Sequence, residues 1–559
     1  MSAGVRLEVK AERVPLVRKA TALLRREVRR RCGVAAGGGG PRIVLDVRSG
    51  IGGEGFRIED APGGRVVVTG NDARGLLYGV GKLLRTSRFD EGRFTPGAWR
   101  GTSVPKCPMR GAYFASHFHN FYHDAPVRAV SQYVEELALW GTNALIVWFD
   151  MHHFKGIKDP AAQKMIERLR AVLRAGKGVG MNVGLCLLGN EAYADSPAEL
   201  RSDPNTGRAH YRVELCPYKP GAKELMLRWF DEEFEAFSDI GIDHVWVWPY
   251  DQGGCACEKC KPWGANGFLV MAEAVAKLLH KRFPDAAVIL STWLYDYGKD
   301  QGEWSGLSKA FARRPAWLDY VLADGHAEFP KYVLTHDAPG GLPLLGFPEI
   351  SMWGMYPWGG YGANPQPRRL QALWDVCGSR LSGGFPYSEG IFEDINKAIF
   401  SQFYWDERRA AAETVREYVA YECSPDVVDD VAHAIEIMEA NHSRWIAQDE
   451  QRNFRLLRDS EGREHCAIGF QNKDAGAAEC FKLLHAVDGR LTPAARKSWR
   501  WRILLLRAML DRDLLTTGGV PTPDCEEAYE ELNSIYHGKR AEMAVAPPTA
   551  EAVRRMRRG

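Results

Sequence analysis

The stretch HVWVWPYDQGGCACEKC, residues 244–260, begins as a strand and ends in a polar loop. Val245 to Trp248 are all apolar, as in a strand that is buried on both faces of a parallel sheet. Asp251 follows where this strand would end, and cysteines stand at 255, 257 and 260. Such a strand needs helices on both sides of its sheet. The stretch therefore predicts an α/β fold with an acid and a cysteine-rich loop at the carboxyl end of a strand.

Seven further apolar segments are similar to this strand, and amphipathic helical segments separate most of them. The predicted strands are 110–116, 144–150, 182–188, 244–251, 287–295, 318–324, 342–353 and 383–390. The predicted helices between them are 126–141, 161–178, 222–237, 266–283 and 368–378. Eight strands joined by helical crossovers are the pattern of a (β/α)8 TIM barrel, which we expect over residues 106–400.

Two smaller units flank the predicted barrel. Residues 1–105 alternate strands at 6–9, 42–47, 55–60 and 65–71 with helices at 16–31 and 72–85, which predicts a small α+β domain. Beyond about residue 395 the strands stop and helical periods continue, so residues 401–559 are predicted to form an α-helical domain. The predicted fold class is α/β: a TIM barrel with an N-terminal α+β domain and a C-terminal α-helical domain.

The bulk composition argues against several classes of partner. The 73 basic and 71 acidic side chains leave a net charge of +2, which favours neither nucleic acid nor an anionic membrane. We interpret the basic runs at 18–32 and 553–559 as a solvated helix face and a chain end. The sequence has no apolar run of about 18 residues and no signal-peptide pattern. We therefore expect no membrane span and a cytoplasmic protein.

Polar and aromatic side chains gather where the predicted strands end, and many of the 17 tryptophans lie there. The active site of a TIM barrel lies at these strand ends. Aromatic faces suit sugar rings, and carboxylates or amides suit hydroxyl groups. We therefore expect a site for an oligosaccharide or glycoside, with candidate binding residues His119, Trp148, Asn190, Glu191, Trp248, Tyr250, Gln252, Trp293, Tyr295, Asp324, His326, Trp353 and Tyr387.

Three acids are the candidates for catalysis. Glycosidic bond cleavage needs a carboxylic acid that protonates the leaving oxygen and a second group that acts as nucleophile or base. Asp251 ends the fourth predicted strand and Glu349 lies in the seventh, so the two face one another across a barrel. Glu389, on the eighth strand, competes for either place. Each acid taken alone also fits a salt bridge or a helix cap.

The cysteines form a second candidate site. Cys255, Cys257 and Cys260 follow the fourth strand, and Cys216 precedes the helix that leads into it. Four thiolates can hold a structural zinc ion in a tetrahedron. The alternative is free thiols that pack a glycine-rich loop. In either case we expect the loop to hold Asp251 in place, and we expect no cofactor for catalysis.

Two other functions stay open. His117 and His119 after the first strand and His152 and His153 after the second allow a metal-dependent hydrolase, although the sequence has no H-E-x-x-H motif. The fourth, fifth and eighth strand ends supply no histidine or lysine for such a centre. A non-catalytic carbohydrate-binding barrel is the second alternative. A homodimer through the C-terminal helices is compatible with either function.

Several motifs resemble those of known glycoside hydrolases. NDARGLLYGVGKLLR (71–85) and PMRGAYFA (108–115) resemble the end of the small α+β domain and the first barrel strand of family 20 β-N-acetylhexosaminidases and family 67 α-glucuronidases. ELCPYKPGAKELMLRWFDEEF (214–234) and DQGGCACEKC (251–260) resemble barrel proteins related to the family 163 endo-β-N-acetylglucosaminidases. The resemblance implies the same domain order over about 400 residues and a glycoside hydrolase, with an N-acetylhexosaminide as one candidate substrate.

The sequence departs from family 20 at two places. The Asp-Glu pair that the resemblance implies at the fourth strand end is Asp251-Gln252 here, and a glutamine cannot donate the proton. Ala115 and Ser116 stand near the place of the aspartate that closes the R-G-x-x-x-D motif. The resemblance therefore predicts a sugar hydrolase without implying the acetamide-assisted mechanism.

Overall fold

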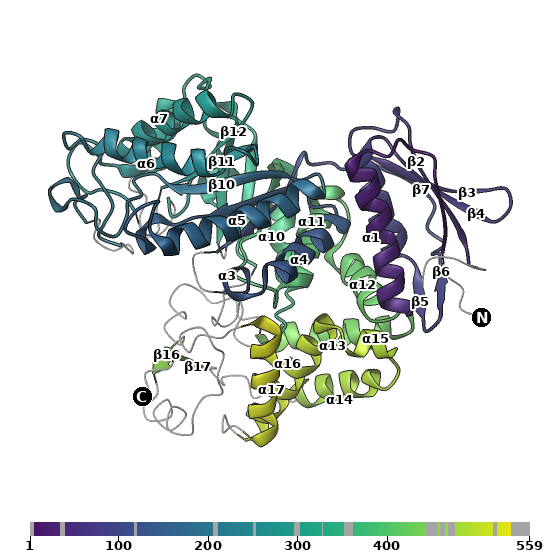
Figure 1. The fold of residues 1–559 in the computed structure, drawn as a ribbon. Coiled ribbons are helices and arrows are strands. Elements are labelled where there is room, and N and C mark those ends of the chain that lie inside the picture. The colour runs from purple at the N-terminus through teal and green to yellow at the C-terminus, as the bar shows by residue number, and fades with distance from the viewer. Residues whose placement is uncertain are drawn as a thin grey trace.

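The computed structural model describes residues 5–33, 40–116, 120–204, 211–249, 253–295, 302–326, 328–350, 362–442, 455–458, 464–467, 476–517 and 522–537. Eight parallel strands close into a barrel (Figure 1). Their order around it is β10 (Asn182–Leu188), β11 (His244–Trp248), β12 (Ala287–Ser291), β13 (Tyr320–His326), β14 (Leu344–Pro348), β15 (Leu381–Gly384), β8 (Met109–Phe114) and β9 (Ala144–Trp148). The predicted TIM barrel is confirmed.

Burial on both faces explains the apolar composition of these strands. Every residue of β8, β9, β11 and β14 is buried, because helices cover the outside and side chains fill the inside of the barrel. Six strands end before their predicted limits, and the differences are largest at β12, which ends at Ser291, β14, which ends at Pro348, and β15, which ends at Gly384. After β12 the chain turns, with Leu294 at a φ of 63° and the Tyr295 amide bonded to the Thr292 carbonyl over 3.1 Å.

Helices follow the strands and cover the barrel. The predicted ones are α4 (Val127–Leu139), α5 (Pro160–Gly178), α6 (Ala222–Ala236), α7 (Gly267–Arg282) and α10 (Pro367–Cys377), and all five are confirmed. Three short helices of the described barrel, α3 (Phe121–Asp124), α8 (Glu303–Ala310) and α9 (Lys331–Thr335), were not predicted. After β15 comes α11 (Asp394–Trp405), which packs on β8 and β15 and is buried along its whole length.

The N-terminal unit is a five-stranded sheet in the order β1 (Arg6–Val9), β2 (Arg42–Val47), β4 (Arg65–Gly70), β3 (Phe56–Ala61) and β7 (Gly101–Ser103). Its helices are α1 (Pro15–Cys32) and α2 (Ala73–Arg85), and a hairpin of β5 (Arg88–Asp90) and β6 (Arg93–Thr95) follows. Glycines let α2 pack closely on both sides. A Cβ at Gly79 would lie 2.7 Å from Val68, and one at Gly81 would lie 2.1 Å from the carbonyl of Leu139 in α4. The GLLYGVG motif therefore joins the sheet to the barrel.

The C-terminal unit contains α12 (Ala411–Glu422), α13 (Val428–His442), α14 (Gly476–Asp488), α15 (Pro493–Arg496), α16 (Trp499–Thr516) and α17 (Pro523–Tyr536). The expectation that strands stop after residue 395 was wrong, because β16 (Arg455–Arg458) and β17 (Glu464–Ala467) pair as an antiparallel hairpin. Thr522 caps α17 by accepting the Cys525 amide, with Pro523 in the first turn. Among the described helices, none is both long and apolar enough to cross a membrane.

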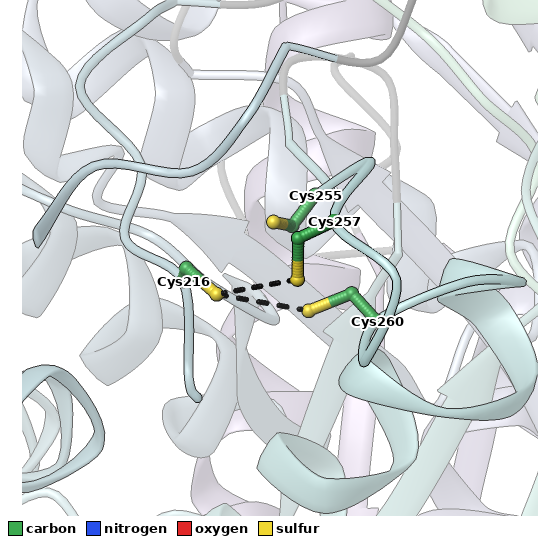
Figure 2. Close-up of side chains that lie close together, drawn as sticks. All are labelled: Cys216, Cys255, Cys257 and Cys260. Carbon is green, nitrogen blue, oxygen red and sulfur yellow. Dashed lines mark hydrogen bonds between the residues drawn. The ribbon is translucent and has the colours of Figure 1, made fainter. Parts of the chain in front are cut away.

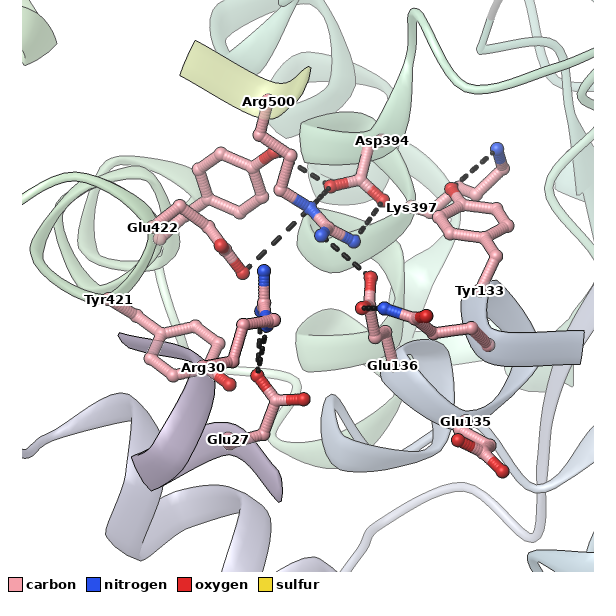
Figure 3. Close-up of polar contacts among 12 residues, drawn as sticks. Glu27, Arg30, Tyr133, Glu135, Glu136, Asp394, Lys397, Tyr421, Glu422 and Arg500 are labelled. Atoms are coloured by element: carbon pink, nitrogen blue, oxygen red, sulfur yellow. Dashed lines mark hydrogen bonds and ion pairs between the residues drawn. The ribbon is translucent and has the colours of Figure 1, made fainter. Parts of the chain in front are cut away.

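A buried ionic network joins the three parts of the chain (Figure 3). Arg500 on α16 donates to Asp394 on α11 over 2.6 Å and to Glu136 on α4 over 2.7 Å. It also lies 3.8 Å from Glu422 on α12, which accepts from Arg31 on α1 over 2.8 Å. Burial opposes ionisation of Glu136, but Arg500 lowers the pKa of that carboxyl to about 2.

The basic run at 18–32 is only partly the solvated face that we expected. Arg30 and Arg31 both bind Glu27, a fully buried acid on their own helix. The side chain of Arg31 is 10% exposed and stacks on the ring of Tyr421, with its guanidinium 3.7 Å from the ring centre. This run therefore docks α1 onto α12. Because a buried cation needs opposite charges, Arg31 pairs with Glu27 on α1 and with Glu422 on α12.

Candidate functional site

Aromatic rings from several strand ends form a continuous layer at the carboxyl end of the barrel. Trp148 of β9 stacks on Trp248 of β11 with ring centres 6.2 Å apart and planes within 14°. Trp248 lies 5.2 Å from Trp293, which follows β12, and 5.3 Å from Phe347 of β14. The three tryptophans are at most 7% exposed. They therefore form an apolar floor, and each presents little of its ring to solvent.

Two of the predicted catalytic acids meet at one tyrosine. Glu349 directly follows β14, Glu389 follows β15, and both are buried. The Tyr387 hydroxyl donates a hydrogen bond to Glu389, and the main chain of Tyr387 forms a parallel β-bridge with that of Glu349. Burial raises the pKa of Tyr387 well above its usual range, and the negative charges of Glu389 and Glu349 add to this effect. Phe347 lies 5.6 Å from Tyr387, so the acids adjoin the aromatic floor.

Groups outside the barrel strands hold this pair of acids. Arg369 on α10 donates to the main-chain carbonyl of Glu349 over 2.9 Å. Tyr536, near the end of α17, donates to the carbonyl of Glu389 over 2.6 Å. A Cβ at Gly390 would lie 2.2 Å from the Tyr536 hydroxyl, which explains the glycine after the acid. The C-terminal helices therefore support the loop that carries Glu389, a contact that no local sequence signal predicts.

A second carboxylate pair lies at the ends of β9 and β10. Glu191 accepts hydrogen bonds from the Met151 amide at 2.7 Å, the Leu188 amide at 2.9 Å and the Trp148 indole at 3.1 Å. Burial, followed by the charge of Asp150, raises the pKa of Glu191 to about 8. Glu191, a predicted hydroxyl ligand, thus uses both carboxylate oxygens to tie the ends of two strands together.

Asp150 is a candidate that the predicted set of site residues did not include. It is buried with a φ of 51°, a strained backbone conformation for a residue other than glycine. Its carboxylate binds His152 and accepts the Tyr211 hydroxyl over 3.2 Å. Burial raises the pKa of Asp150 to about 7, as a general acid at neutral pH requires. Its place directly after an apolar strand was the sequence signal that could have identified it.

Tyr113 of β8 lies between the two carboxylate pairs. Its hydroxyl is buried and has no hydrogen-bond partner among the described residues. Burial raises the pKa of Tyr113 well above its usual range, and negative charges at Cys186, Asp150, Glu389 and Glu191 would add to the shift. Carboxylates that follow β9, β10 and β15 therefore all act electrostatically on this one hydroxyl.

Two predicted binding residues have their polar groups engaged by the protein. The Asn190 amide donates to the carbonyls of Leu215 and Gly254, each over 3.0 Å, and its oxygen accepts the Gly254 amide over 2.9 Å. The Tyr295 hydroxyl donates to the Gly264 carbonyl over 2.8 Å. Both side chains are buried and fix the loop after β11. Their contribution to substrate binding remains a prediction.

The structure does not describe every predicted site residue. His119, Tyr250, Asp251, Gln252 and Trp353 lie outside the described residues, as do His117 and Asp296. Asp324 and His326 lie in the last part of β13, at the carboxyl end of the barrel, without described side chains. The roles of these residues stay predictions.

One buried acid on a helix was also missed. Glu233 of α6 is 1% exposed, and neither of its oxygens has a hydrogen-bond partner in the described part of the chain. Burial raises the pKa of Glu233 well above its usual range, with further contributions from Glu191 and Asp150. Its position in a charged stretch of an amphipathic helix gave no sequence signal that it faces the barrel.

The four predicted metal ligands lie together (Figure 2). The Sγ atoms of Cys216, Cys255, Cys257 and Cys260 all lie within 4.8 Å of one another. Cys216 approaches Cys257 and Cys260 at 3.8 Å each. All four are free thiols, and only Cys257 is more than slightly exposed. The set fits a tetrahedral metal ion and also fits a packed group of thiols.

Comparison with known proteins confirms the fold. No protein-family model matches the chain, and no curated protein matches its sequence. The structure is similar to a family 115 4-O-methyl-α-glucuronidase, with a TM-score of 0.62 and 10% identity over 100% of this chain and 79% of that one. It is also similar to a family 20 β-N-acetylglucosaminidase, with a TM-score of 0.51 and 15% identity over 75% and 92%. The family 89 enzyme from Clostridium perfringens gives a TM-score of 0.57 and 11% identity over 93% and 64%.

These similarities bear out the predicted resemblance in fold to barrel glycoside hydrolases, family 20 among them. The identities of 10–15% show the architecture alone. The chemistry therefore has to be argued from this chain's own side chains.

Proposed function

We propose that this protein is a glycoside hydrolase that uses carboxylates at the carboxyl end of its barrel. The observation that carries the proposal is the position of Tyr387, which donates to Glu389, pairs through its main chain with Glu349 and lies beside an aromatic floor. Two acids beside apolar rings supply the groups that glycosidic bond cleavage requires. The barrels of similar architecture belong to glycoside hydrolases of several families, which supports the assignment.

Each acid has a role in this proposal. Glu389 accepts a hydrogen bond from the Tyr387 hydroxyl and acts as nucleophile or base. Glu349 stands at the end of the neighbouring strand and positions substrate or shares the acid–base work. The proton donor is Asp251, which the sequence predicted as one of the catalytic acids, or Asp150, whose pKa burial raises to about 7. The substrate is a short glycoside, for which N-acetylhexosaminides and uronides are the first candidates because neighbouring structures carry such activities.

The test is a screen of the full chain against aryl α- and β-glycosides, including N-acetylated and uronic sugars. Glu389→Gln and Glu349→Gln are compared with Glu167→Gln, which alters an exposed acid on α5. We expect turnover of at least one glycoside, a loss of several decades in kcat for Glu389→Gln, and wild-type rates for the control. Sugar binding without turnover, unchanged by the two site variants, would favour a non-catalytic carbohydrate-binding barrel.

A metal-dependent hydrolase is the second candidate, and one observation favours it. Potential ligand atoms of Asp150, His152 and His153 lie within 4.8 Å of one another at the end of β9. If this group holds a catalytic metal ion, a chelator abolishes turnover and a divalent ion restores it. If the reaction uses carboxylates alone, rates in the same screen do not change during brief exposure to chelator.

A further inference from the structure

We propose that Cys216, Cys255, Cys257 and Cys260 bind one structural zinc ion that fastens together the loops following β10 and β11. The proposal is independent of the reaction that the barrel catalyses. Its evidence is the geometry of the four sulfur atoms, their burial and the hydrogen bonds of the two loops that carry them.

The sulfur spacing matches a tetrahedral zinc site. With Zn–S bonds of about 2.3 Å, the edges of a tetrahedron are about 3.8 Å long. Cys216 approaches Cys257 and Cys260 at 3.8 Å each, and all four sulfur atoms lie within 4.8 Å of one another. A disulfide would bring two sulfur atoms to about 2.05 Å, and all four cysteines are free. The spacing is therefore that of ligands around a common centre.

The four thiols come from two separate loops that the fold brings together. Cys216 follows β10, on the turn before α6, and the other three lie between β11 and α7. The Cys216 amide bonds to the Leu200 carbonyl over 3.0 Å, and the Ala256 amide bonds to the Asp203 carbonyl over 3.0 Å. Asn190 bridges the residues next to the ligands, Leu215 and Gly254. These hydrogen bonds hold the two loops, and with them the cysteines, in place.

A turn of the main chain brings two of the ligands together. The amides of Cys260 and Lys261 both bond to the Cys257 carbonyl, at 3.0 and 3.2 Å, and form the turn that brings this C-x2-C pair together. On binding zinc, each thiol that is protonated loses its proton to solvent and becomes a ligand.

The ligand set indicates a structural role. Four cysteine ligands fill the tetrahedron and leave no position for water or substrate, unlike a catalytic zinc site. Cys216, Cys255 and Cys260 are at most 2% exposed, so the ion would be enclosed. The second loop begins with the segment that contains Asp251. The zinc ion would therefore hold the loops that follow β10 and β11 together, at the carboxyl end of the barrel where the candidate acids lie.

The experiment measures metal in the full chain purified without chelator. We expect about one equivalent of zinc per chain, and the Co²⁺-substituted protein should show the strong absorption of a tetrahedral tetrathiolate. Cys257→Ser should keep less than about a tenth of the zinc after dialysis against a competing chelator. The control is Cys377→Ser, which retains the hydrogen bond from position 377 to the Leu373 carbonyl and should keep the full equivalent.

Direct measurements on the unaltered chain remain decisive if Cys257→Ser fails to fold. Four thiols that react with a thiol reagent in the folded chain, without metal, would overturn the proposal. Iron in place of zinc would overturn the choice of ion. A second equivalent of metal that Cys257→Ser retains would belong to Asp150, His152 and His153. The metal content therefore distinguishes a structural zinc site from the catalytic metal site of a metal-dependent hydrolase.

Discussion

Tyr387 donates a hydrogen bond to the carboxylate of Glu389, which stands only two residues after it on the loop following β15. The same tyrosine bridges to Glu349 on the neighbouring strand end. Tyr387 therefore meets Glu389 through its side chain and Glu349 through its main chain, and its hydroxyl is the proper target for a first test.

Replacing Tyr387 with phenylalanine should remove the donor and keep the ring. Glu389 then loses a hydrogen bond to its charged form, so the pKa of Glu389 should rise. A hydrogen bond to a charged group contributes about 1.5–3 kcal/mol, and we expect kcat/KM to fall roughly 10- to 150-fold. The pH–rate profile should show the acid limb at higher pH.

The control for this change is Tyr332→Phe. The Tyr332 hydroxyl bonds to Ser308 over 2.9 Å, between α8 and α9. An equal loss of activity in both variants, or an acid limb that does not move in Tyr387→Phe, would contradict the role of the Tyr387 hydroxyl.

The Asp150–Glu191 pair should make the protein less stable as pH rises. Burial raises the pKa of Asp150 from 3.8 to about 7 and that of Glu191 from 4.5 to about 8. The folded state therefore binds more protons than the unfolded state between these limits. The contribution of the pair is complete below about pH 4 and is lost as pH rises toward 8.

Urea unfolding at pH 5 and pH 8 measures this effect. We expect the free energy of unfolding to fall by about 6 kcal/mol between the two, and Glu191→Gln to reduce this difference. The same glutamine should lower stability at both pH values, because one amide oxygen cannot accept all three hydrogen bonds. Glu167→Gln, on the surface of α5, should leave the pH dependence unchanged. If the free energy of unfolding of Glu191→Gln still falls by the same amount between pH 5 and pH 8, other groups cause the pH dependence.

Removing Arg500 should strongly destabilise the protein. Arg500→Met leaves Asp394, Glu136 and Glu422 buried without their shared cation, which typically costs about 3–5 kcal/mol. Arg502→Met on the same helix breaks a partly exposed pair with Glu531 and should cost less than about 1 kcal/mol. Chemical denaturation measures the free energy of unfolding of both variants. Similar losses of stability in the two would contradict the claim that the buried ion pairs matter more than the exposed one.

The sequence alone predicted the barrel because the signal is local. Segments such as Val245–Trp248 are apolar throughout, and strands of this kind must be covered by helices on the outside of a closed sheet. Local signals also identified α1 and α2, through their helical periodicity, and the four cysteines, through their spacing. The hairpin of β16 and β17 escaped because neither strand shows the apolar run that identified the barrel strands.

Only the tertiary structure decided which polar residues meet. Glu389 owes its support to Tyr536, from the last described helix, and Asp150 owes its raised pKa to burial. Asn190 is an amide at a strand end in the sequence, and in the fold it is the bridge between two loops. Periodicity records whether a residue faces water or the core, whereas a carboxylate's chemistry depends on neighbours that are distant in the sequence. The sequence therefore determined the scaffold, and long-range packing determined the candidate site.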